Sequence, residues 1–96
     1  MRRDGERLVI SGPVTLANVG AVLAEGVGQL REGARTFDLG QVTEIDSSLL
    51  AAMLSWMREA RHQQAEIEFA NLPEGLATIA RLYGVDGLLP GTGAHH

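Results

Sequence analysis

Two residue types are missing from this chain of 96 residues, which contains no cysteine and no lysine. Without cysteine the chain can form neither a disulfide framework nor a zinc–thiolate site, and a reducing compartment is the simplest expectation. Its 8 basic residues are all arginines, scattered along the sequence against 12 Asp and Glu. The net charge of −4 and the lack of a basic cluster argue against nucleic-acid binding, because phosphate contacts need a basic face.

The chain also lacks an apolar run long enough to cross a bilayer, which takes about 20 residues. We expect no signal peptide, because Met1 is followed by Arg2, Arg3 and Asp4 rather than by apolar residues. These absences predict a cytoplasmic protein that does not insert into a membrane. A composition of 45% hydrophobic and 21% charged residues is typical of one globular domain. We expect that domain at residues 1–90, followed by a flexible C-terminal tail at 91–96.

Apolar periodicity predicts strands that alternate with helices in the order β-α-β-α-β-α. The expected strands are 7–11, 35–39 with an extension over 42–45 after a turn, and 65–72. The expected helices are 15–30, 47–63, and a third that 71–73 opens and that ends at Tyr83. Thr15 is expected to cap the first helix. In the third helix we expect Gly84 to be the stop and four residues to face inward, namely Leu76, Ile79, Ala80 and Tyr83. This alternation predicts an α/β fold, in which helices pack on a small mixed or parallel sheet.

The helix expected at 47–63 has an unusually wide apolar face. With 100° per residue, its apolar side chains cover an arc of about 200°, against the roughly 100° that a surface helix needs. Either a small domain buries most of this helix, or one margin of the arc is a docking strip for a protein partner. Tryptophan, which this margin contains, is enriched among interface hot spots. The strip would comprise Leu49, Ala52 and Trp56, with Ser48, Ser55 and Glu59 beside it.

The start of the same helix carries an acid and two hydroxyls, Asp46, Ser47 and Ser48. Asp46 is expected to be the N-cap and to accept a hydrogen bond from the backbone N–H of Ser48 or Leu49. The serines then lie in the first turn, exposed at a loop–helix junction. They are either tolerated first-turn residues or a phosphorylation switch, since an added phosphate would remodel any surface docked there.

Catalytic equipment is not visible in the sequence. A serine nucleophile needs an oriented base, and the one non-terminal histidine, His62, lies about 20 Å from Ser47 by helical rise. The glycines match neither the phosphate-binding loop nor the dinucleotide fingerprint, and no metal-ligand spacing occurs. We therefore expect no enzyme activity, no cofactor and no metal.

The segment "FDLGQVTEIDSSLLAAML", residues 37–54, resembles the signature of STAS domains, the family of bacterial anti-sigma-factor antagonists and of domains attached to sulfate transporters. In that signature a strand ending in D-L/F-x-x-V leads through a short loop to D-S-S/T-G-L at a helix start. The resemblance extends over residues 7–90 and implies a mixed, largely parallel sheet packed with helices. The helix "SLLAAMLSWMREARHQQ" and the ending "LATIARLYGVDGLLP" are most similar to the MlaB-type group, the small STAS subunits of phospholipid-transporting ABC systems.

The resemblance implies a non-enzymatic accessory subunit that binds the ATPase subunit of such a transporter, at the inner face of the inner membrane. The partner contact of that group falls on Ser47. The serine phosphorylated in anti-sigma antagonists falls on Ser48, so the alternative is an antagonist that binds an anti-sigma kinase until it is phosphorylated. Leu49 stands where the family usually has glycine. Its bulk weakens the phosphorylation interpretation more than the docking interpretation.

Overall fold

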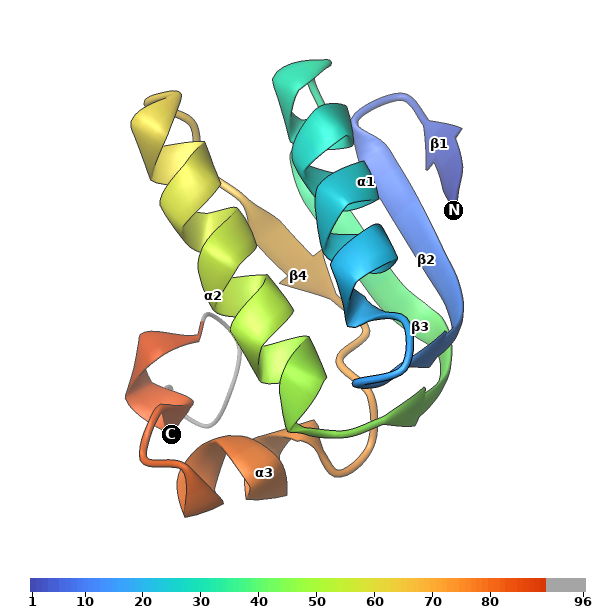
Figure 1. Cartoon of the computed structure of the whole chain (residues 1–96). Helices are drawn as coiled ribbons and strands as arrows, with labels where there is room; N and C mark the ends of the chain where they lie inside the picture. The colour runs from blue at the N-terminus through green and yellow to red at the C-terminus, as the bar shows by residue number, and fades with distance from the viewer. Residues whose placement is uncertain (90–96) are drawn as a thin grey trace.

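Two long helices lie side by side over one face of a four-stranded sheet, and a shorter helix lies below them (Figure 1). This computed structural model describes residues 1–89, so the predicted tail at 91–96 lies outside the described residues and the boundary at residue 90 stays a prediction. The strands are β1 (Arg2–Asp4), β2 (Arg7–Val14), β3 (Thr36–Ile45) and β4 (Glu68–Ala70). The helices are α1 (Val19–Arg31), α2 (Ser47–His62), α3 (Leu76–Leu82) and the 3-10 turn η1 (Asp86–Leu88).

The strands are ordered β1-β2-β3-β4 across a mixed sheet. β2 pairs parallel with β3, and β3 pairs parallel with β4, whereas β1 pairs antiparallel with β2. The predicted α/β class with a mixed, largely parallel sheet is therefore confirmed. Strand β1 was not predicted, because its three polar residues carry no apolar alternation. The two-residue loop Gly5-Glu6 begins with a glycine at φ +63°, and a glycine at this loop position is a hairpin signal that could have revealed the strand.

Several predicted boundaries differ from the structure. β3 runs unbroken through the expected turn at 40–41, and β4 covers only three of the residues expected at 65–72. α1 begins at Val19 instead of at Thr15, because residues 15–18 form a turn of their own. In that turn the Asn18 side chain accepts from the Thr15 N–H at 3.0 Å, and the Asn18 N–H donates to the Thr15 carbonyl at 3.0 Å. Leu16 is consequently 79% exposed and lies outside the helix.

Helix α3 buries Leu76 and Ala80 as predicted. The inward orientation predicted for Tyr83 is wrong, because this side chain is 63% exposed. The helix ends at Leu82, and Gly84 follows in the left-handed region at φ +72°, as its predicted role as a stop requires. Beyond that turn Leu89 is buried in the core, whereas Leu88 is exposed.

The centre of the core is Trp56 of α2, which has no exposed surface. Its ring packs edge-on against Phe37 of β3, with centroids 4.8 Å apart, and Phe69 of β4 completes the cluster. The indole Nε1 donates a hydrogen bond of 3.1 Å to the carbonyl oxygen of Leu23 in α1. Burial of this large amphipathic ring therefore leaves no unpaired donor, as a well-packed core requires.

Gly26 allows α1 to approach this indole. A Cβ atom added at Gly26 would lie 2.4 Å from Nε1 of Trp56, far inside van der Waals contact. A glycine in mid-helix costs about 1 kcal/mol relative to alanine, and packing of the ring against the bare backbone offsets that cost. The distance between α1 and α2 thus depends on one residue without a side chain.

We predict that Gly26→Ala destabilises the fold by about 1–3 kcal/mol, since the new methyl group overpacks the core against Trp56. The matched control is Gly28→Ala on the same helix, where an added Cβ meets nothing within 4 Å. Gly28→Ala is expected to stabilise the protein by about 0.5–1 kcal/mol through helix propensity. Urea unfolding of the three proteins measures both changes, and equal stabilities of the two variants would contradict the proposed contact.

Candidate functional site

Asp46 organises the start of α2. It is the N-cap, and its Oδ1 accepts from the Ser48 N–H at 2.8 Å, as predicted. Its Oδ2 also accepts from the Leu16 N–H at 3.0 Å, which ties the turn before α1 to the start of α2. The Leu16 and Ser48 N–H groups, in that order of effect, hold the pKa of the Asp46 carboxyl below its ordinary value. One carboxylate therefore fixes the loop–helix junction that carries the two serines.

Ser47 and Ser48 are both partly exposed in the first turn of α2. The Ser48 side chain also hydrogen-bonds to the Asp46 carboxylate, whereas Ser47 lies at the edge of a groove described below. The two hydroxyls thus have different surroundings. Ser48 bonds to the carboxylate of the N-cap residue Asp46, and Ser47 borders the groove.

The three central residues of the predicted docking strip do not lie on the protein surface. Leu49, Ala52 and Trp56 are fully buried, since α1 packs over this flank of α2 through the contact between Gly26 and Trp56. The interpretation of these three residues as exposed partner contacts is therefore wrong, and the alternative, burial of a wide helix face, holds. A helical projection gives the angular spread of apolar residues but cannot show which neighbouring element covers each side.

Ser55 and Glu59, expected beside the strip, are half-buried rather than exposed. Glu59 forms an ion pair with Arg31 of α1 at 3.2 Å and accepts a hydrogen bond from Gln63 at 3.4 Å. These contacts, Gln63 first and then Arg31, lower the pKa of the Glu59 carboxyl. Glu59 thus links the ends of α1 and α2, and this role needs no partner.

Asp38, part of the motif that resembles STAS domains, also has a structural role. Its carboxylate pairs with Arg7 of β2 at 2.7 Å and accepts from the Asn71 side chain at 3.0 Å and the Gly40 N–H at 2.9 Å. The pKa of Asp38 is lowered, chiefly by the Asn71 hydrogen bond. Because Arg7 and Asn71 belong to β2 and to the loop after β4, this carboxylate joins three neighbouring segments of the sheet.

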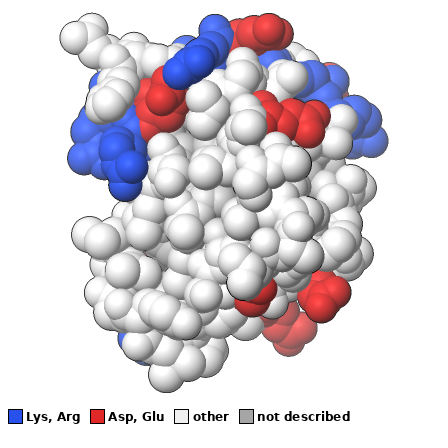
Figure 2. All heavy atoms as spheres, viewed as in Figure 1, with Lys and Arg blue, Asp and Glu red and all other residues white. Residues whose placement is uncertain are grey.

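The open flank of α2 is the one opposite the predicted strip. A mostly apolar groove of about 330 Å³ lies between α2 and the end of α3. It is lined by Ser47, Leu50, Ala51, Leu54, Tyr83 and Val85. The spacing of Ser47, Ala51 and Leu54 (i, i+4, i+7) places them on one helix face, which is the sequence signal that could have identified this flank. Figure 2 shows this side of the molecule, where charged side chains gather at the two ends and leave an uncharged surface between them.

Within residues 1–89 there is no cluster of three or more His, Cys, Asp or Glu that could hold a metal ion. His62 is exposed at the far end of α2 from the serines. Across the same residues, none of the helices has the length and apolarity needed to cross a bilayer. The groove presents apolar side chains together with the hydroxyls of Ser47 and Tyr83.

Comparison with known families identifies the family of this chain. The family model described as "Mlab, STAS domain" matches residues 1–90, nearly the whole chain. A search of curated proteins found no match.

The Asp46 hydrogen bonds predict a specific response to acid. Because the folded-state pKa lies below the ordinary value of 3.8, these bonds stabilise the fold above that value, and their contribution is lost as the pH falls through the folded-state pKa. We predict that Asp46→Ala has a lower Tm than the original chain at pH 7 and that the difference shrinks toward pH 3.

Circular dichroism melts at several pH values measure this response. Glu25→Ala, which removes an exposed carboxylate of α1, is the control and should retain the acid profile of the original chain. A difference in Tm between Asp46→Ala and the original chain that stays constant with pH would show that the carboxylate charge contributes nothing.

Proposed function

Because the chain belongs to the STAS domain family of the Mlab type, we propose that it is a non-enzymatic accessory subunit that binds the ATPase subunit of a phospholipid-transporting ABC system. STAS domains are generally regulatory modules without enzymatic activity. In this proposal the protein acts at the inner face of the inner membrane, where its partner holds it. Its role is structural, since docking favours the assembled, active arrangement of the ATPase by mass action.

The observation that carries the proposal is the position of Ser47 at the edge of the α2–α3 groove. The family resemblance implies a partner contact at this residue, and its position at the groove supports that role. Next to it the groove presents Leu54, which is partly exposed, and Tyr83, which is 63% exposed. A hydroxyl beside apolar and aromatic side chains is typical of an interface core, where tyrosine is enriched.

Exposed apolar residues close in sequence to the groove residues Tyr83 and Val85 support the same proposal. Leu82, at the end of α3, is 78% exposed, and Leu88, in η1, is 59% exposed. Burial of apolar surface contributes about 25 cal/mol per Å². A partner that covers this segment would therefore gain free energy by burying Leu82 and Leu88.

We predict that Ser47→Arg and Ala51→Arg each weaken binding to the proposed partner, the ATPase subunit of a phospholipid-transporting ABC system, by about tenfold or more, because a large charged side chain blocks the groove. The assay is copurification followed by titration calorimetry. Ser11→Arg, on an exposed position of β2, is the matched control and should bind like the original chain. Unchanged binding by both groove variants would remove the groove from the interface.

The alternative function, an anti-sigma-factor antagonist, depends on Ser48. This serine is partly exposed on the first turn of α2, where a helix N-terminus tolerates a phosphate. The Asp46 carboxylate, which bonds to both the backbone and the side chain of Ser48, opposes that addition by charge repulsion. The docking function therefore has the better support.

We predict that Ser48 acquires no phosphate when the protein is incubated with ATP and the anti-sigma kinases of its host. Intact-mass spectrometry detects a single added phosphate, and a known antagonist incubated in parallel serves as the positive control. A stoichiometric phosphate on Ser48 that also abolishes kinase binding would establish the alternative.

A further inference from the structure

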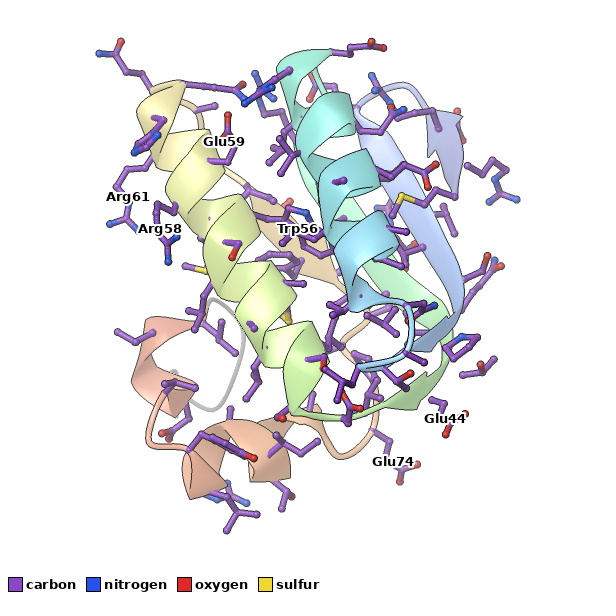
Figure 3. The ribbon with its side chains drawn as sticks, in the orientation of Figure 1. Glu44, Trp56, Arg58, Glu59, Arg61 and Glu74 are labelled. Atoms are coloured by element: carbon purple, nitrogen blue, oxygen red, sulfur yellow. The ribbon has the colours of Figure 1, made fainter. Side chains whose placement is uncertain are left out.

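Two arginines extend the groove flank of α2 toward its C-terminal end. Arg58 lies one helical turn beyond Leu54, and Arg61 lies about one turn further, so both follow the face that begins with Ser47 and Ala51. Figure 3 shows both side chains projecting from the same side of α2, away from α1. Beyond Leu54, the face of α2 that borders the groove therefore has a basic end, where Arg61 also lines a separate hollow with Glu66.

Neither arginine has a carboxylate partner in the described part of the chain. The ion pairs there are Arg7–Asp38 and Arg31–Glu59, and no side-chain hydrogen bond involves Arg58 or Arg61. Both residues are exposed. Two unpaired guanidinium groups at the end of an apolar groove attract a carboxylate, to which a guanidinium binds with matching geometry.

The other end of α2 carries the opposite charge. Glu44 and Glu74 lie near the start of α2, where together with Ile45 and Pro73 they line a polar hollow (Figure 3). A partner carboxylate near the start of α2 would lie closer to like charge than one beside Arg58 and Arg61. This difference favours the orientation that places the carboxylates at the C-terminal end of α2.

The dimensions suit a helix. From Ser47 to Arg61 the helical rise amounts to about 21 Å, which a partner helix of about 14 residues would match. A helix that lies in an apolar groove presents side chains at i, i+3 or i+4, and i+7, and these would meet Ala51, Leu54 and Tyr83 in turn. Carboxylates on the next turn of the partner helix would then lie beside Arg58 and Arg61.

We propose that the occupant of the groove is an amphipathic helix of the ATPase subunit, with apolar side chains between Leu54 and Tyr83 and carboxylates beside Arg58 and Arg61. This inference rests on the proposed function and adds the chemistry and orientation of the partner segment. The arginines are rim charges, which govern the association rate and its salt dependence and fix the register.

The test is charge reversal at the basic end. Arg58→Glu and Arg61→Glu are each expected to weaken binding to the ATPase subunit named in the proposed function about fivefold or more. The loss should appear mainly as slower association, and the decrease of affinity with added salt should be smaller than for the original chain. Arg2→Glu, an exposed arginine of β1, makes the same change of charge away from the groove and should bind like the original chain.

Four outcomes contradict the proposal, and each has its own signature. If the original chain binds the ATPase and all three arginine variants bind equally, the groove helix is not acidic at this end and the proposed function stands. If the original chain does not bind the ATPase at all, the proposed function and this inference fail together. If the arginine variants bind the ATPase like the original chain but no longer float with phosphatidylglycerol vesicles, the basic end binds an anionic lipid surface. If they lose only self-association in sedimentation experiments, the occupant is a second copy of this chain.

Discussion

The contact between Gly26 and Trp56 determines how the two main helices sit on the sheet. Because position 26 has no side chain, the indole lies directly against the backbone of α1, and its N–H is satisfied by the Leu23 carbonyl. This contact turns the Trp56 flank of α2 inward, together with Leu49 and Ala52. The opposite flank is left facing solvent, so the location of the groove follows from this packing.

The Asp46 carboxylate plays the second organising role. It caps α2 and also holds the turn that precedes α1, so two segments far apart in the sequence meet at one side chain. This arrangement places Ser48 against the carboxylate and leaves Ser47 at the groove. Two adjacent hydroxyls that look equivalent in the sequence therefore differ in what they can contact, which separates a cap residue from a candidate interface residue.

The interpretation of α2 as a docking helix shows where local reasoning succeeds and where it fails. The cap, the extent of the helix and the breadth of its apolar face were predicted from residues close together in the sequence. The flank predicted to be open was the wrong one. Which flank of α2 is covered depends on Gly26, some 30 positions from Trp56. The sequence alone shows glycine as a helix breaker at this position and gives no sign that an aromatic ring would lie against it. Strand β1 and the exposed position of Tyr83 were missed for related reasons, since the first lacks an apolar pattern and the second lies just beyond the end of its helix.

By itself the sequence determined the α/β class, the order of the helices and longer strands, the N-cap at Asp46 and the STAS family, since these depend on periodicity, local hydrogen bonding and a continuous motif at 37–54. Only the tertiary structure decided which side of α2 meets solvent, because exposure is set by neighbours that are distant in the chain. It also decided that Arg58 and Arg61, which form no ion pair among the described residues, follow the helix face that borders the groove, since that groove exists only once α3 packs near α2.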